Sequence, residues 1–228
     1  MLFLGGVAAI AALGVLFVYS ASCYTAKVQY GDAFYFLKKQ LLGFFLGLAA
    51  MLFLSRADAA RWKKAGVPAL VAAVLLLAAV FIPGLGKTSY GATRWLGLGP
   101  VTLQPSELAK FAFVLFSAGH FASDPSRPRR FSGILPVLGA GASLCVLILL
   151  EPNLSVTMVM GALMLGMLFL AGTPKKTLLL ILLPILLAVP VLILAEPYRL
   201  RRLMAFLDPW ASPQDEGYQL IQSLYALA

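Results

Sequence analysis

Seven apolar stretches, each close to the length needed to cross a bilayer, constrain the fold of this chain more than any other feature. A hydrocarbon core of about 30 Å takes roughly 20 apolar residues per helix. The stretches run over residues 2–19, 36–54, 67–82, 107–122, 133–150, 155–171 and 177–195. Their Leu, Ala, Val and Gly content lacks the alternation of barrel strands, so each predicts a helix. The sequence therefore predicts an all-α polytopic membrane protein with about seven transmembrane helices.

The composition agrees with a protein whose solvent is mostly lipid. Hydrophobic residues make up 61% of the 228 and charged residues 12%, whereas soluble chains are about a quarter charged. The net charge of +9 suits anionic lipid headgroups. Because no basic run is interleaved with an aromatic platform, we expect no nucleic-acid partner. Cys23 and Cys145 lack metal-ligand spacing. Residues 1–19 lack a basic start, so we expect a retained first span rather than a cleaved signal peptide.

The loops between the stretches fall into two sets, because successive spans alternate in direction. One set is short and holds nine Lys or Arg against two acids: residues 55–66, 123–132 and 173–176. Short basic loops mark the cytoplasmic side of a membrane protein. We therefore expect a cytoplasmic N-terminus, with the longer loops 83–106 and 196–228 facing outward.

The longest chemically equipped connection is GATRWLGLGPVTLQPSELAK, residues 91–110. Pro105 and Ser106 predict a helix start, since proline is preorganised for the first helical position. Glu107 and Lys110 are three residues apart and share one face of that helix. One interpretation is a local ion pair. We favour the other, a pair that faces a cavity or a polar substrate, because ionisable groups at a span's mouth are costly in lipid.

Arg94 and Trp95 lie in what the glycines around them predict to be a turn. One interpretation is an interfacial tryptophan beside a snorkelling arginine. The other is an arginine that holds a phosphate through forked hydrogen bonds. Gln104 fits either a donor to a sugar or a cap of the following helix, and the sequence does not separate the two.

A second outward patch covers residues 196–224. Arg199, Arg201 and Arg202 form a basic edge suited to a lipid headgroup or a diphosphate. A solvated amphipathic helix would show the same pattern. Asp208 is either a site carboxylate or, as we favour, part of a helix stop with the proline that follows it.

The segment Glu151-Pro152-Asn153 separates the fifth and sixth stretches. A carboxylate at a span end is costly unless it meets water or a partner. Pro152 predicts a break in the helix at this point.

These residues carry a resemblance to a known family. The stretch 91–110 resembles the signature loop of the SEDS proteins (shape, elongation, division and sporulation), whose familiar members are FtsW, RodA and SpoVE. Further stretches agree in order: VYSAS, FLKKQL, EPNLS, and RLMAFLDPWASPQDEGYQLIQSLYALA at the C-terminal end. The resemblance covers essentially the whole chain. FLKKQL and GYQLIQS resemble the FtsW and SpoVE branch more than RodA.

The resemblance implies a peptidoglycan glycosyltransferase of the bacterial cytoplasmic membrane. Such enzymes polymerise lipid II on the outer face, release undecaprenyl diphosphate, and work beside a class B penicillin-binding protein and other divisome or elongasome proteins. By position, Glu107 and Lys110 match polar residues of the family's central cavity and are the catalytic candidates. The candidate substrate-binding residues are Arg94, Trp95, Gln104, Ser106, Arg199, Arg202 and Asp208. The resemblance names no certain cofactor and leaves a divalent metal requirement open.

Two departures from the family pattern bear on activity. Asn153 stands where many members have an aspartate. The family resemblance also implies roughly ten spanning helices of about 20 residues each, and the chain ends at Ala228, before the family's His-Thr-Asp-Phe segment with its proposed catalytic aspartate. We expect one SEDS-type transmembrane domain over residues 1–228, the N-terminal portion of the family's fold, and no lipid II polymerisation by this polypeptide alone.

Two other classes of function compete with the glycosyltransferase. A flippase or transporter of lipid-linked precursors would need polar groups at mid-membrane and on both faces, whereas here they gather on the outer face. A non-catalytic divisome scaffold would use small-residue faces such as Gly43 and Gly47 for helix packing. The chain has no G-x-x-x-x-G-K-[ST], H-E-x-x-H or G-x-S-x-G motif, which argues against an ATP-driven pump, a zinc protease of that type and a lipase-like enzyme.

Overall fold

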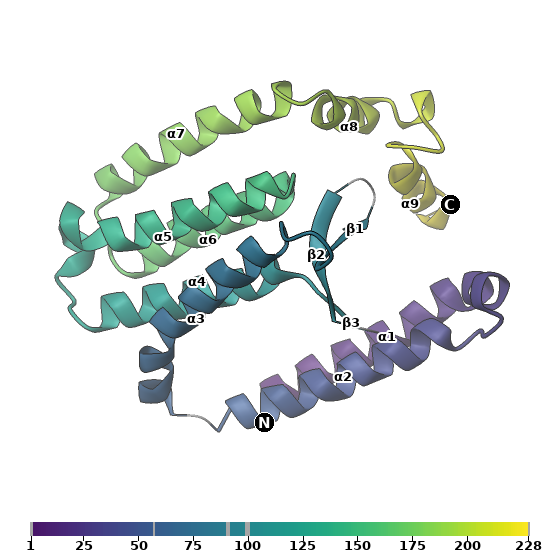
Figure 1. Ribbon diagram of the computed structural model, residues 1–228, viewed down its shortest axis with the longest axis horizontal. Helices are drawn as coiled ribbons and strands as arrows, with labels where there is room; N and C mark the ends of the chain where they lie inside the picture. Colours follow the sequence, from purple (N-terminus) through teal and green to yellow (C-terminus); the bar gives the residue numbers. More distant parts are fainter. Residues whose placement is uncertain (1, 57, 90–91, 99–100, 228) are drawn as a thin grey trace. The chain divides into compact units, whose positions relative to one another are not determined.

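The computed structural model describes the chain except residues 1, 57, 90–91, 99–100 and 228, and it divides into two compact units, Met1–Arg61 and Trp62–Ala228 (Figure 1). All seven expected stretches are helical: α1 (Leu2–Tyr30), α2 (Tyr35–Leu54), α3 (Ala59–Ala79), α4 (Pro105–Ala122), α5 (Phe131–Leu150), α6 (Leu154–Leu170) and α7 (Lys175–Leu194). Within these, α1, α2, α3, α5 and α7 are long and apolar enough to cross a membrane. The apolar α6 is shorter, and α4 carries Glu107 and Lys110 in its first turns. The prediction of a helical, multi-pass membrane protein is confirmed.

The first unit is a pair of packed helices, α1 and α2. Helix α1 continues beyond the expected boundary at residue 19, because no helix breaker occurs before Gly31, whose φ of +70° suits only glycine. The short connection is held by an ion pair between Lys38 Nζ and Asp32 Oδ2 at 2.7 Å. The rings of Tyr19 and Phe34 also stack there. Helix α2 buries none of its residues, as expected of an apolar helix whose surroundings are lipid.

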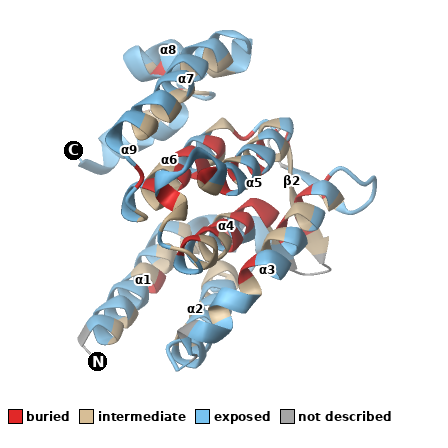
Figure 2. Cartoon of the chain, turned by 90° about the vertical axis from the view of Figure 1, so that its left-hand side faces the viewer, coloured by how far each residue is buried: buried red, intermediate tan, exposed pale blue. Residues whose placement is uncertain are grey.

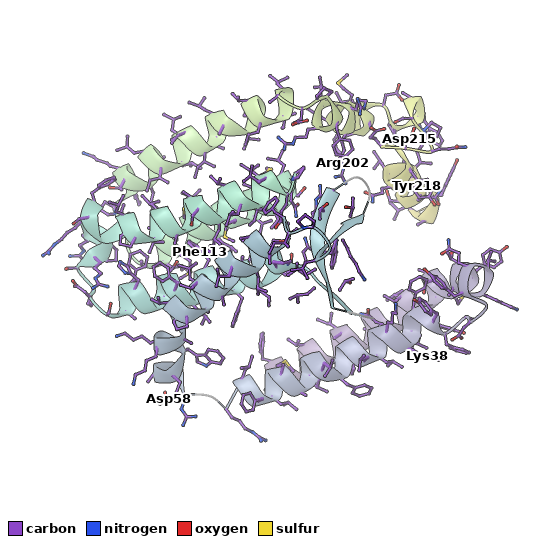
Figure 3. All side chains as sticks on the ribbon, viewed as in Figure 1. Lys38, Asp58, Phe113, Arg202, Asp215 and Tyr218 are labelled. Atoms are coloured by element: carbon purple, nitrogen blue, oxygen red, sulfur yellow. The ribbon has the colours of Figure 1, made fainter. Side chains whose placement is uncertain are left out.

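The core of the second unit lies among α4, α5 and α6. Figure 2 shows buried residues concentrated on these three helices. Phe113 on α4, Leu144 on α5 and Met160 on α6 are completely buried and belong to one apolar cluster. Figure 3 labels Phe113. Gly141 lets these helices approach, because a Cβ there would lie 2.6 Å from the sulfur of Met164. This rigid centre is the support for the loops at one end of the helices.

A small antiparallel sheet, absent from the all-α prediction, occupies the connection between α3 and α4. It consists of β1 (Gly86–Ser89), β2 (Ala92–Leu98) and β3 (Val101–Leu103), in the order β1-β2-β3. The expected turn around Arg94 is therefore wrong, since Arg94 and Trp95 lie inside β2. The glycines misled the prediction: Gly97 serves a close contact rather than a turn, because the aliphatic part of Lys87 lies against it.

His120, near the end of α4, hydrogen-bonds to the first turn of α5 and so stabilises the connection between the two helices. His120 Nε2 lies 2.7 Å from the carbonyl oxygen of Gly133, and a carbonyl only accepts, so Nε2 carries the hydrogen. Nδ1 is then an acceptor for the Arg127 guanidinium at 3.3 Å. Arg127 also donates to the backbone oxygen of His120 and to Ser123 Oγ. His120 therefore ties the end of α4 to the first turn of α5.

Glycine substitutions on α5 provide a test of this packing. A Cβ at Gly133 would lie 2.3 Å from the backbone oxygen of Arg127, whereas a Cβ at Gly139 meets nothing within 4 Å. Gly133→Ala should lower the stability of the protein by about 1–3 kcal/mol because the backbone must shift. Gly139→Ala should be neutral or stabilising by up to about 1 kcal/mol through helix propensity. Thermal unfolding in detergent measures both; equal midpoints for the two variants would contradict the described packing.

Candidate functional site

Three segments that are far apart in sequence meet around one pocket of about 540 Å³ in the second unit. One wall comes from β2 and from the turn between α5 and α6. The other comes from the end of α7 and from α8 (Pro197–Leu207). The lining residues are Ala92, Arg94, Pro152, Asn153, Leu154, Ser155, Ile193, Glu196, Tyr198, Arg199, Arg202, Leu203 and Phe206. The pocket thus joins the sheet loop and the α8 segment, both of which sequence analysis had singled out.

Arg94 connects the sheet to the turn between α5 and α6. Its Nε donates to the carbonyl oxygen of Glu151 at 3.1 Å, and its Nη2 donates to that of Pro152. Side chains alternate along a strand, so Ala92 and Arg94 share the face of β2 that lines the pocket. The forked donors predicted for a phosphate are in this structure directed at backbone carbonyls. Arg94 therefore shapes the pocket wall as well as supplying charge to it.

Glu151 lies beneath this contact and is buried, with 1% of its surface exposed. It follows the last residue of α5 and lies outside the spanning helices. Neither carboxyl oxygen has a hydrogen-bond partner among the residues the structure describes. Burial raises the pKa of this carboxyl to about 7, and the charge of Arg94 opposes the shift. Arg94, 57 positions away, contacts Glu151 through its backbone oxygen, and its charge is the nearby compensation for the carboxyl.

Asn153 caps α6. Its Oδ1 accepts from the backbone N–H of Val156 at 3.4 Å, and its own backbone oxygen accepts from Thr157 Oγ1 at 3.0 Å. Asparagine and aspartate cap helices about equally well. The departure from the family's aspartate at this position therefore keeps the turn intact. The predicted break at Pro152 is confirmed, since α5 ends at Leu150 and α6 begins at Leu154.

Helix α8 sorts its arginines between two faces. Arg199 and Arg202 are three residues apart, so they share the face that lines the pocket. Arg199 Nη1 donates to the carbonyl oxygen of Leu192 at 2.7 Å, which holds it against the end of α7. Arg201 instead pairs with Glu216 at 3.2 Å. The basic edge predicted from sequence is thus divided into two pocket residues and one structural residue.

The remaining predicted site residues lie outside the pocket lining. Glu107 and Lys110 form the local ion pair at 2.9 Å on the first turns of α4, with Lys110 the more buried. Trp95 lies opposite Lys87 on the neighbouring strand and alternates with the pocket face. Ser106 is completely buried, and its hydroxyl has no partner among the described residues.

Gln104 and Asp208 both occupy the residue before a helix begins. Gln104 precedes α4 and Asp208 precedes a short 3-10 helix, Pro209–Ala211, yet neither side chain makes a capping hydrogen bond. The predicted start of α4 at Pro105 is confirmed. Both residues therefore occupy N-cap positions without capping the helix through their side chains.

Sequence reasoning missed several residues of the pocket. Glu196, Tyr198 and Phe206 line it together with Arg199 and Arg202. For Tyr198 and Phe206 the spacing from Arg202 on α8 was the available signal, because residues four apart lie on one helical face. The role of the α5–α6 turn had no such signal, since its contact with Arg94 depends on the tertiary fold.

The pocket combines positive charge with an apolar side. Three arginines and one glutamate line it, next to Ile193, Leu203 and Phe206. Such a lining suits an anionic group attached to a hydrocarbon chain. Within the part of the chain that the structure describes, no group of three or more His, Cys, Asp or Glu side chains is placed to hold a metal ion.

A second hollow lies within the first unit. A groove of about 380 Å³ runs between α1 and α2. Half of its lining residues are small: Ala8, Ala11, Gly14, Gly43 and Gly47. Small residues on adjacent turns let the backbone of another helix approach closely in a membrane.

The helices define a multi-pass membrane protein, and its second unit contains a pocket lined by arginines and apolar side chains. Comparison with known proteins gives the particular family. The sequence profile of the FtsW/RodA/SpoVE cell cycle proteins matches residues 1–228. The chain belongs to this family, as its resemblance to the SEDS proteins implied.

The relatives of this chain are longer than it is. It is 36% identical over 224 residues to a probable peptidoglycan glycosyltransferase FtsW of Legionella pneumophila, covering 98% of this chain and 57% of that protein. The corresponding protein of Nitrosococcus halophilus is 40% identical over 98% of this chain and 58% of its own length. The chain thus spans somewhat more than half the length of these relatives.

Solved structures agree with the family. One, from work on the structural coordination of polymerization and crosslinking by a peptidoglycan synthase complex, has a TM-score of 0.71 and 32% identity, covering 97% of this chain and 62% of that one. The rod shape determining protein RodA of Thermus thermophilus has a TM-score of 0.57 and 29% identity, covering 77% and 58%. Both support a helical membrane fold for this chain.

Proposed function

We propose that this chain provides the lipid-diphosphate site of a peptidoglycan glycosyltransferase that polymerises lipid II. The carrying observation is the pocket of about 540 Å³ lined by Arg94, Arg199 and Arg202 beside an apolar side. Lipid II joins a diphosphate to a polyprenyl chain, so its binding site must place cationic side chains next to an apolar groove. The names of the relatives, probable peptidoglycan glycosyltransferases, support the same substrate class.

The arginines act on the leaving group. Bond formation between sugars releases a polyprenyl diphosphate, on which negative charge develops. Preorganised cations in a water-poor site stabilise developing charge more than they stabilise the substrate. Arg199 is already fixed to the end of α7, so little side-chain entropy is lost on binding. Arg202 is the more exposed of the two and makes the first contact.

Glu107 and Lys110 remain candidates for the reacting end of the substrate. They lie on α4, and α4 contacts β2, the strand that carries Arg94. The base that deprotonates the acceptor hydroxyl is not assigned to this chain. This chain covers 57% of the length of its Legionella relative, and we propose polymerisation for the full-length fold of the family.

Arg202→Ala should weaken the binding of lipid II about tenfold, because a charge-assisted hydrogen bond is lost. Arg201→Ala removes the same charge from the same helix but only breaks the pair with Glu216, so its effect should stay below about twofold. Titration of detergent-solubilised protein with lipid II measures both affinities. A chimera in which this chain replaces the matching residues of a full-length relative adds polymer formation as a second readout, in which Lys110→Ala should abolish polymer without weakening binding.

Equal losses for Arg202→Ala and Arg201→Ala would show that general surface charge, and not the pocket, attracts the lipid. Transport of a labelled lipid across vesicles by the chain, with no polymer from the chimera, would favour the flippase instead.

We further infer a cytoplasmic N-terminus. Strand β2, the α5–α6 turn and the start of α8 meet at one pocket, as three loops on the same side of a membrane must. The basic connections 55–66, 123–132 and 173–176 then lie on the other side, which is the cytoplasmic side by their charge. A membrane-impermeant maleimide should label Lys87→Cys, but not Lys64→Cys, in intact cells of a variant without Cys23 and Cys145. The reverse pattern would invert this topology.

The groove of the first unit favours a partner helix, and we propose the membrane anchor of a class B penicillin-binding protein. The comparison structure from a peptidoglycan synthase complex supports an assembly of this kind. Gly47→Leu should fill the groove and reduce co-purification with the partner severalfold, since a close backbone contact is lost. Gly166→Leu, on α6 with nothing within 4 Å of its Cβ, is the control. Equal recovery of the partner with both variants would place the contact elsewhere.

A further inference from the structure

The buried carboxyl of Glu151 is the one feature beside the pocket that substrate binding alone does not explain. It is 1% exposed, and both of its oxygens are without a hydrogen-bond partner among the described residues. An isolated buried carboxylate costs several kcal/mol or more, so it must be protonated or electrostatically compensated. Arg94 is the group that supplies such compensation.

Arg94 contacts both the α5–α6 turn and the pocket. Its Nε and Nη2 face the backbone oxygens of Glu151 and Pro152, and the same side chain lines the pocket. The favourable energy between a guanidinium and a carboxylate falls when an anion approaches that guanidinium from its other side. The Glu151 carboxylate and an anion in the pocket would therefore both be stabilised by the guanidinium of Arg94.

We propose that Glu151 is a positioning residue for the pocket: its backbone oxygen accepts from Arg94, and its buried carboxyl attracts Arg94 when the pocket is empty and takes up a proton as an anion binds. This inference rests on the proposed function, since it concerns the same site, and it adds a proton to the binding step. The balance is simple: one proton moves from solvent to the Glu151 carboxyl, and the anion takes over the charge of Arg94. No covalent bond changes.

The direction of the pH effect follows from linkage. An anion in the pocket disfavours the ionised form of Glu151, so the bound state holds its proton up to a higher pH than the free state does. Since burial already places the pKa of the free protein's carboxyl at about 7, binding should tighten as the pH falls from 8 to 6. The gain cannot exceed about tenfold per pH unit for one proton.

Other charged groups of the pocket must be separated from this effect. Arg199 and Arg202 on α8 keep their charge throughout the range, because guanidinium groups are not deprotonated in proteins. Glu196 and Tyr198 line the same pocket from the α7–α8 corner. Glu196 is exposed, whereas Glu151 is buried, so the two carboxylates form a matched pair for substitution.

The test is the affinity for inorganic pyrophosphate of the purified chain at pH 6 and pH 8, measured by calorimetry for wild type, Glu151→Gln and Glu196→Gln. Pyrophosphate itself titrates in this range, but equally for all three proteins. The ratio of the affinities at pH 6 and pH 8 should be about fivefold to tenfold larger in wild type than in Glu151→Gln. Glu196→Gln should bind more tightly at both pH values, because a negative charge leaves the pocket, and should keep the wild-type ratio.

Each outcome decides between the two proposals. If wild type binds pyrophosphate but Glu151→Gln shows the same ratio, the role of Glu151 is overturned while the pocket stands. If wild type binds no pyrophosphate at either pH, both proposals fail. Should Glu151→Gln not fold, competition of sulfate against pyrophosphate in wild type replaces it, since sulfate does not titrate between pH 6 and 8. A sulfate affinity that does not change with pH would then overturn the proton uptake.

Discussion

The two hydrogen bonds from Arg94 to the backbone of Glu151 and Pro152 are the constraint on which the rest of the site depends. They connect a strand of the α3–α4 loop with the turn between α5 and α6. Without them, the sheet would touch the helices mainly through β2 and α4. Charge-assisted hydrogen bonds are about twice as strong as neutral ones, so one side chain suffices to close the wall of the pocket. The same contact places a positive charge at that wall.

The burial of Glu151 makes this contact costly to lose. In a soluble protein, water reaches most carboxylates at helix ends and satisfies them. Here the apolar cluster of α4, α5 and α6 extends to Ile148, three residues earlier and completely buried. A carboxyl at that boundary gains little from solvent, and removing its cation would leave an uncompensated buried group. This dependence explains why an arginine, which cannot lose its proton, serves the position better than a lysine.

Local sequence patterns predicted the parts of the fold that local physics decides. Seven apolar stretches became seven helices, Pro105 began α4, and the break at Pro152 separated α5 from α6. The sheet was missed because the glycines around Arg94 were interpreted as turn signals, whereas Gly97, inside β2, provides room for Lys87. Among the residues of the site, the arginines of α8 were predicted from sequence because they form a cluster of positive charge. The pairing of Arg94 with the turn was not, because no sequence pattern connects residues 57 positions apart.

The arrangement of α8 also limits what the pocket can accept. Arg199 and Arg202 share one face with Leu203 and Phe206, while Arg201 is neutralised by Glu216 on another. A helix meant only to adhere to anionic lipid would gain from three unpaired arginines. Because Arg201 is paired and Arg199 and Arg202 line a concave, partly apolar site, α8 attracts anionic lipid surfaces less. It offers a defined geometry to a specific ligand instead. A ligand that fits this lining carries its negative charge at one end and hydrocarbon beside it. A soluble sugar phosphate would leave Ile193, Leu203 and Phe206 uncovered, and a fatty chain without phosphate would leave the arginines unpaired.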